Sequence, residues 1–217
     1  MINLKAIIFD FDGVICESTE IKDRAYYQTY LPYGKDVAEY ALKYHKENEG
    51  VSRVKVFPYI HKTLLNITLK EEELNKIVKK YSQTVVNQVI NAPLVNGVQN
   101  FLEKYSNKLP LYISSGTPQD EMRQITTAKN LTKYFKKVYG SPDTKDIHIT
   151  RILNSLNIEP QQCIFVGDAT TDRDMAKKKN VNFVARIKPD SLLNDEILKI
   201  FDFWDLENII KNLCKID

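Results

Sequence analysis

The feature that most constrains the fold of this chain is a recurring short apolar run that ends at polar residues. The first run covers residues 4–9, is rich in Ile and stops abruptly at Asp10. Such a run suits a strand buried on both faces. The predicted strands are residues 4–9, 109–113, 163–166 and 182–185, and the predicted helices between and after them are residues 97–105, 119–129, 147–156 and 175–179. Strands that alternate with helices predict an α/β fold, with a parallel sheet covered by helices on both faces.

One long segment departs from this alternation. Residues 17–92 show helical periodicity only, with aromatic and aliphatic side chains at the spacing of a buried helix face. Turns are expected at Pro32, Gly34, Gly50 and Asn66. We therefore predict a core domain formed by residues 1–16 and 93–217, and an inserted four-helix domain formed by residues 17–92. The regular spacing favours core packing over ligand stacking for the tyrosines of the insert.

Composition and charge narrow the classes of partner. Lys and Arg exceed Asp and Glu by 31 to 28, and a net charge of +3 is too small for a nucleic-acid footprint. No apolar run approaches the roughly 18 residues of a membrane span, and the first residues lack the pattern of a signal peptide. Three cysteines without close pairing favour a reducing compartment. We expect a cytoplasmic protein without a nucleic-acid or membrane partner, and no pattern indicates its oligomeric state.

Two carboxylates follow the first strand. Ligands of an open parallel sheet bind beyond the carboxyl ends of its strands. Asp10 and Asp12 lie there, two residues apart and therefore pointing the same way in an extended segment. A carboxylate such as Asp10 can attack phosphorus as a covalent nucleophile, while Asp12 serves as acid and then as base. Aspartates also suit a turn or a helix start, which is the alternative for this pair taken alone.

The next two segments contribute hydroxyl groups and a cation. Residues 114–118 follow the second predicted strand and offer Ser114, Ser115 and Gly116 as a phosphate cradle before a helix. Ser114 is the residue expected to hold the phosphoryl group. Lys145, at the start of a later helix, could neutralise both phosphate and carboxylates. A common helix cap and an abundant residue type are the respective alternatives.

A second acidic pair, Asp168 and Asp172, follows the strand at residues 163–166. Magnesium prefers carboxylate oxygens together with water and substrate phosphate. Asp168 suits a direct ligand, and Asp172 suits a ligand or a group that supports one. No Cys and His spacing indicates zinc.

Taken together, the motifs resemble the four-motif signature of the haloacid dehalogenase superfamily, and the resemblance covers essentially the whole chain. Its residues are Asp10-Phe11-Asp12-Gly13, Ser114, Lys145 and Gly167-Asp168 with Asp172. The insert resembles the four-helix cap of the subgroup that contains phosphoglycolate phosphatases and beta-phosphoglucomutases. This resemblance implies a Rossmann-like core, a cap that closes over a small-molecule phosphate ester, and Mg²⁺ held by the Asp10 carboxylate, the Asp12 backbone carbonyl and Asp168.

The resemblance also indicates which reaction of the superfamily this chain is expected to catalyse. An acid at Asp12 favours phosphate esters, because the dehalogenases of the family lack it. Lys22 stands where the sugar phosphomutases carry a histidine, which favours a phosphatase over a beta-type phosphomutase. Arg53, beside the Gly50 turn, is the candidate for contacting a second anionic or hydroxyl-rich part of the substrate.

Two rival classes remain open. A phosphorylation-switched receiver module uses similar residues, but its acceptor follows a later strand and its domain is shorter. A catalytically silent binding protein of the same fold would not need to keep every proposed catalytic group. We expect a phosphatase acting on a sugar phosphate or a phosphoglycolate-like metabolite.

Overall fold

The computed structural model describes residues 1–189 and 191–216, and its centre is a parallel sheet. The sheet has six strands in the order β4-β3-β2-β5-β6-β7, and all neighbouring strands run parallel. The strands are β2 (Ala6–Phe9), β3 (Leu111–Pro118), β4 (Lys137–Ser141), β5 (Cys163–Gly167), β6 (Asn182–Arg186) and β7 (Lys199–Ile200). A two-stranded parallel sheet of β1 (Ile2–Asn3) and β8 (Cys214–Lys215) joins the two ends of the chain.

The alternation of side chains along β2 explains why helices cover both faces of the sheet. Ile7 and Phe9 belong to a cluster with residues of α5 (Val98–Tyr105), α6 (Gln119–Ala128) and α9 (Phe203–Leu213). Ala6 and Ile8 belong to a second cluster with residues of α7 (Lys145–Leu156) and α8 (Thr170–Lys178). Because every residue of β2 is buried, the strand must be apolar throughout. The predicted α/β fold with a parallel sheet core is confirmed.

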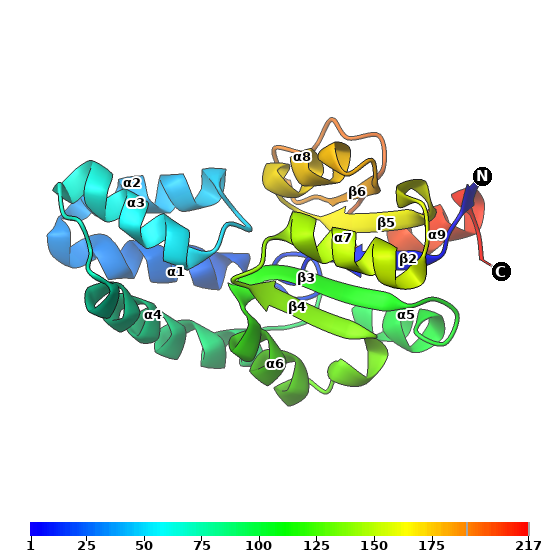
Figure 1. Cartoon of the computed structure of the whole chain (residues 1–217), viewed down its shortest axis with the longest axis horizontal. Coiled ribbons are helices and arrows are strands. Elements are labelled where there is room, and N and C mark those ends of the chain that lie inside the picture. Colours follow the sequence, from blue (N-terminus) through cyan, green and yellow to red (C-terminus); the bar gives the residue numbers. More distant parts are fainter. Residues whose placement is uncertain (190, 217) are drawn as a thin grey trace.

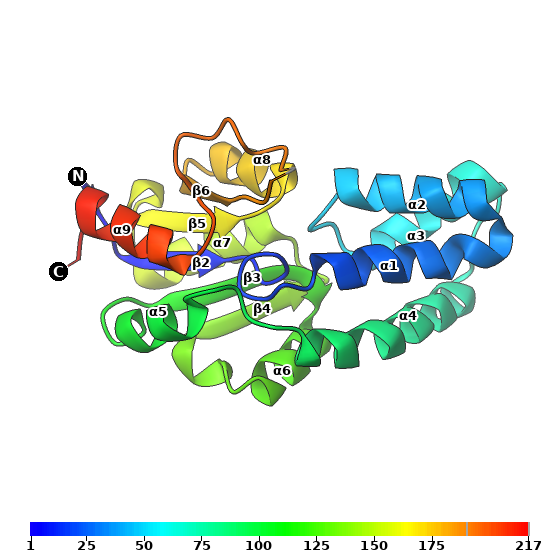
Figure 2. The same cartoon turned by 180° about the vertical axis from the view of Figure 1, so that it is seen from behind.

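A layer of helices lies beside the carboxyl ends of the strands (Figures 1 and 2). It consists of α1 (Thr19–Tyr30), α2 (Lys35–Glu47), α3 (Arg53–Leu65) and α4 (Glu71–Asn91). Tyr26 of α1 occupies the middle of this cap, where it contacts one aromatic side chain from each of the other three helices. Its ring centroid lies 4.0 Å from His45, 5.4 Å from Phe57 and 5.0 Å from Tyr81. These aromatic side chains therefore hold the four helices together.

Several predicted boundaries differ from the observed ones, most clearly in one strand and two helices. The predicted strand at residues 109–113 is β3, which starts at Leu111 and continues as far as Pro118. The helices predicted at residues 147–156 and 175–179 begin earlier, at Lys145 and Thr170. Polar residues at the end of a strand or at the start of a helix do not follow the apolar pattern. The pattern therefore covers fewer residues than the element does. The division into residues 1–16 with 93–217 and residues 17–92 stays a prediction.

The described part of the chain contains no helix that is both long enough and apolar enough to cross a membrane. This finding concerns residues 1–189 and 191–216.

Replacing Phe9 by Ala tests the packing beneath the site. Phe9 is fully buried, and its ring lies 6.0 Å from Phe101 and 5.7 Å from Phe203. We expect Phe9→Ala to lower the free energy of unfolding by about 3–5 kcal/mol in urea denaturation, because the cavity left behind closes only in part. Phe201→Ala is the matched control, since Phe201 is 60% exposed, and its effect should stay below about 0.5 kcal/mol. Equal losses in the two variants would contradict this account of the core.

Candidate active site

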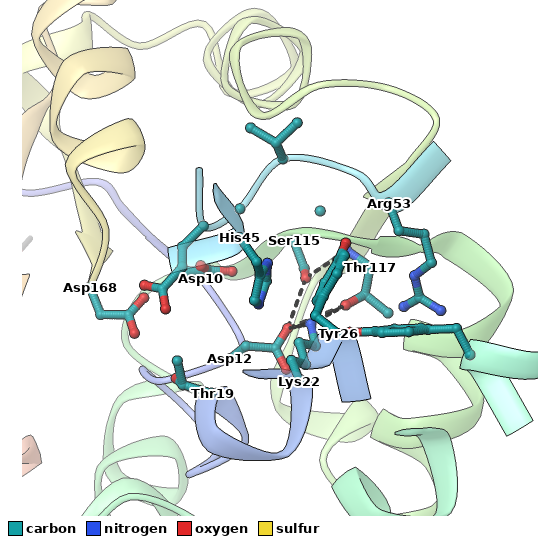
Figure 3. A pocket seen from close by; sticks show the side chains of 15 residues that line it. Asp10, Asp12, Thr19, Lys22, Tyr26, His45, Arg53, Ser115, Thr117 and Asp168 are labelled. Carbon is teal, nitrogen blue, oxygen red and sulfur yellow. Dashed lines mark hydrogen bonds and ion pairs between the residues drawn. The ribbon is translucent and has the colours of Figure 1, made fainter. Parts of the chain in front are cut away.

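A cavity lies between the cap and the carboxyl ends of the strands (Figure 3). Both parts of the chain contribute polar side chains to its wall. The lining residues are Asp10, Asp12, Ser115, Gly116, Thr117 and Asp168 from the core, and Thr19, Lys22, Tyr26, His45, Glu49, Gly50, Val51, Arg53 and Tyr81 from the cap. Parallel strands all end at the same edge of the sheet. The core residues that follow different strands therefore lie close together there, although they are far apart in the sequence.

Asp10 lies at the base of this cavity, directly after β2. Its Oδ2 is 2.8 Å from Nζ of Lys145, and its Oδ1 accepts the backbone N–H of Phe11 at 2.6 Å. Lys145 also contacts Oδ1 of Asp172, at 2.6 Å. Burial raises the pKa of Asp10 to about 7, although the charge of Lys145 opposes this rise. Burial alone would lower the pKa of Lys145, but the charges of Asp10 and Asp172 raise it above its ordinary value.

Three carboxylates are gathered around this point. One oxygen each from Asp10, Asp168 and Asp172 lies within 4.8 Å of the others. Burial, and then the charge of Asp10, raises the pKa of Asp168 well above its ordinary value. Oδ2 of Asp172 is buried without a hydrogen-bond partner among the described residues. The single ammonium of Lys145 does not balance these charges, so the group of oxygens fits a divalent cation such as Mg²⁺.

Gly13 makes room for this acidic group. Its backbone has a φ of +73°, and a Cβ atom at this position would lie 1.7 Å from Oδ2 of Asp168. A side chain at Gly13 would therefore displace a carboxylate of the site, which accounts for a glycine directly after the second aspartate.

Asp12 is held by the cap. Lys22 of α1 forms an ion pair with Oδ2 of Asp12 and donates to Oγ1 of Thr117 at 2.8 Å. Ser18 donates to Oδ1 of Asp12 at 2.7 Å, and Thr117 donates to Oδ2 at 3.2 Å. Burial alone would raise the pKa of Asp12, but the charge of Lys22 holds it below its ordinary value. The carboxylate of Asp12 is thus fixed and ionised beside Asp10.

The expectation for Ser114 is corrected by the structure. Its hydroxyl is buried and shares a hydrogen bond of 2.9 Å with Nδ1 of His148, so it does not line the cavity. Ser115 lines the cavity, and its Oγ accepts the backbone N–H of Thr117 at 3.1 Å. The reason is that β3 continues to Pro118, and successive residues of a strand point to opposite faces. The predicted strand ends at residue 113, one residue before Ser114, and therefore leaves the direction of that side chain undetermined.

Arg53 lines the cavity, but its charge is directed at the core. Its Nη2 lies 3.0 Å from Oε2 of Glu121 in α6, and its Nη1 donates to Oγ of Ser82 at 2.9 Å. The guanidinium also covers the ring of Tyr81, 4.6 Å from the centroid. Arg53 therefore joins α3 to α6 and α4 in this structure.

Sequence reasoning missed several residues of the wall, above all His45, Glu49 and Thr117. Helical spacing predicts which residues turn inward, but it does not show which inward residues lie at the end nearest the sheet. Lys22 was recognised by its distance from Asp12 in the sequence, yet nothing in the sequence indicated that the two would form an ion pair.

The acid pair of Asp10 and Asp12 lies beneath a helical cap, in the wall of one cavity. Residues 7–186 match the model of the haloacid dehalogenase-like hydrolase family. The chain belongs to this family, as the four motifs predict.

Several known proteins are similar to this chain. A phosphorylated carbohydrates phosphatase of Thermotoga maritima is 24% identical over 218 residues, which cover 88% of this chain and 97% of that protein. A phosphoglycolate phosphatase of Escherichia coli is 25% identical over 202 residues, which cover 81% and 78%. The solved structure of a beta-phosphoglucomutase of Clostridium difficile has a TM-score of 0.75 at 20% identity and covers 96% of each chain. The last likeness establishes the shared fold.

Gly116 tests how the cap meets the core. A Cβ atom on Gly116 would lie 2.2 Å from the backbone oxygen of Gly50, so Gly116→Ala should hold the cap away from the sheet. We expect a larger radius of gyration in small-angle scattering, with little change in the free energy of unfolding. Gly34→Ala is the control, because its methyl group meets nothing within 4 Å while its φ of +116° strains the backbone. This variant should lose stability and keep the compact form; an unchanged radius in Gly116→Ala would contradict the close approach.

Proposed function

We propose that this protein is a magnesium-dependent phosphatase that hydrolyses a small phosphorylated metabolite through an aspartyl phosphate on Asp10. The observation that carries this proposal is the placement of Asp10, between the ammonium of Lys145 and the fixed carboxylate of Asp12, in the wall of the cavity. A carboxylate at this position can attack a phosphorus atom that enters the cavity.

Asp10, Asp168 and the backbone carbonyl of Asp12 would hold Mg²⁺, with Asp172 beside them. Bound magnesium supplies positive charge that neutralises the phosphate oxygens and draws the ester toward the nucleophile. The unpartnered Oδ2 of Asp172 and the closeness of the three carboxylates support this assignment.

The remaining polar groups serve the two chemical steps. Asp12 is ionised in this structure and takes up a proton when the ester binds. In the first step, Asp10 forms a bond to phosphorus, the bond from phosphorus to the leaving oxygen breaks, and that oxygen takes the proton from Asp12. In the second step, the ionised Asp12 takes a proton from water, the water oxygen attacks phosphorus, and the bond to Asp10 breaks with release of phosphate. Lys145 and the hydroxyl of Ser115 contact the phosphoryl group. The ion pair with Lys22 favours the ionised form of Asp12 that the second step needs.

The nature of the substrate is supported by the relatives. One is named a phosphorylated carbohydrates phosphatase and another a phosphoglycolate phosphatase. We infer a sugar phosphate or a phosphoglycolate-like ester. Lys22, in place of the histidine of the phosphomutases, supports hydrolysis over transfer between sugars.

Turnover of para-nitrophenyl phosphate is the direct test of this function. We expect hydrolysis with magnesium and its loss in excess EDTA. Asp10→Asn should lower kcat by at least about a thousandfold, because an amide of equal shape is a poor nucleophile. Thermal unfolding of the variant should remain cooperative, which shows that the fold is kept. Absence of turnover by the unmodified protein, or activity above a few per cent in Asp10→Asn, would contradict the mechanism.

Alanine variants of the adjacent Ser114 and Ser115 test which of the two side chains contacts the phosphate and which one stabilises the fold. We expect Ser115→Ala to lower kcat/KM by about tenfold to a hundredfold with little effect on stability. Ser114→Ala should instead cost about 1–3 kcal/mol of unfolding free energy, because it leaves Nδ1 of His148 buried without its partner. Steady-state kinetics and urea denaturation of both variants give the comparison. The reverse pattern would return the phosphate contact to Ser114.

A further inference from the structure

The cations of the cavity wall are already neutralised by the protein itself. Lys22 contacts Asp12 and Thr117, and Arg53 contacts Glu121. Of the residues that the structure describes, Lys22 and Arg53 are the only cations that line the cavity. Among the described residues that line this cavity, no cation is therefore left unpaired for a substrate, apart from the phosphate-binding groups.

The pair of Arg53 and Glu121 is difficult to break. Arg53 is 4% exposed, and Oε1 of Glu121 accepts a second hydrogen bond from Ser82 at 2.6 Å. A substrate carboxylate that took Arg53 for itself would leave Glu121 half-buried without its cation, which is strongly unfavourable. Glu49, which also lines the cavity, adds a carboxyl group that cannot neutralise an anion.

Unlike Lys22 and Arg53, His45 is a polar residue of the cavity wall whose hydrogen-bonding atoms are not used by the described residues around it. It is 6% exposed and lines the cavity, and both of its ring nitrogens lack a hydrogen-bond partner within the described chain. Nε2 lies 3.5 Å from Oδ1 of Asp23 without forming a hydrogen bond. Figure 3 shows the ring among the side chains that line the cavity. A buried polar group without a partner is costly, so this ring is poised to gain one from a ligand.

The ring is suited to hydroxyl groups in particular. Burial, and then the charge of Lys22, lowers the pKa of His45 to about 3, so the imidazole is neutral at physiological pH. A neutral imidazole donates from one nitrogen and accepts at the other, as a hydroxyl group does. The ring of Tyr26, which stacks on His45, and the ring of Tyr81 also line the cavity and provide apolar walls for carbon atoms.

We propose that this cavity selects phosphate monoesters whose leaving group is uncharged and carries hydroxyl groups, with His45 as the residue that binds those hydroxyls. The ion pair of Arg53 and Glu121 excludes leaving groups that carry a carboxylate or a second phosphate. This inference rests on the proposed phosphatase function and chooses between its two substrate types, in favour of sugar and polyol phosphates.

Matched substrate pairs test the selection. Glycerol 3-phosphate and 3-phosphoglycerate differ by a carboxylate in place of a terminal CH₂OH group, and glucose 6-phosphate and 6-phosphogluconate differ in a similar way. We expect kcat/KM to be at least about tenfold higher for the uncharged member, a difference of about 1.4 kcal/mol. Turnover of para-nitrophenyl phosphate, which has no hydroxyl group, reports the proposed function separately.

Variants of Glu121 and His45 assign the selection to these residues. Glu121→Gln should release the charge of Arg53 and raise kcat/KM for the anionic member relative to the uncharged one by about tenfold. Asp120→Asn is the matched control, because this neighbouring carboxylate is 96% exposed and should leave the ratio unchanged. His45→Phe should lower kcat/KM for the uncharged members by about tenfold and spare para-nitrophenyl phosphate, and His45→Gln should restore part of the loss.

The outcomes separate this inference from the function on which it depends. Turnover of para-nitrophenyl phosphate together with equal or better turnover of the anionic members would overturn the selection and leave the phosphatase intact. The same conclusion follows if only the aryl ester is hydrolysed, or if His45→Phe lowers all activities equally. No turnover of any ester would contradict the phosphatase function itself.

Discussion

The ammonium of Lys145 is the group on which the rest of the site depends. It contacts the carboxylates of Asp10, which directly follows β2, and of Asp172, which lies in the first turn of α8. Carboxylates gathered this closely in a buried place repel one another, and each would otherwise favour its neutral form. The ammonium of Lys145, the first residue of α7, therefore holds the end of β2 and the start of α8 together at this edge of the sheet.

The cap is fastened to this edge by polar contacts. Lys22 contacts Asp12, Arg53 contacts Glu121, and Ser52 Oγ lies 3.2 Å from Ser141 Oγ. Apolar contacts around Tyr26 hold the cap helices to one another, within an apolar cluster that also includes core residues such as Ile7 and Phe9. Contacts made of hydrogen bonds and ion pairs can be exchanged for water when a cap lifts, whereas an apolar centre keeps the four helices moving as a unit.

The proposed chemistry and the proposed selectivity occupy opposite walls of one cavity. Core residues such as Asp10 and Ser115 face the phosphate, and cap residues such as His45 face the leaving group. Lys22 connects the two, because a cap residue sets the ionisation of Asp12. Seating of the cap and activation of the acid and base are therefore coupled in this structure.

The sequence by itself determined the elements and the order of the motifs, because apolar runs and helical periods are local and each motif follows its strand directly. It thereby identified Asp10, Asp12, Lys145, Asp168 and Asp172 as neighbours at one edge of a parallel sheet. Only the tertiary structure decided which of two adjacent serines faces the cavity, since that depends on how far β3 continues. It also paired Arg53 with Glu121 and left the ring nitrogens of His45 without a hydrogen-bond partner among the described residues, because both outcomes depend on contacts between helices far apart in the chain.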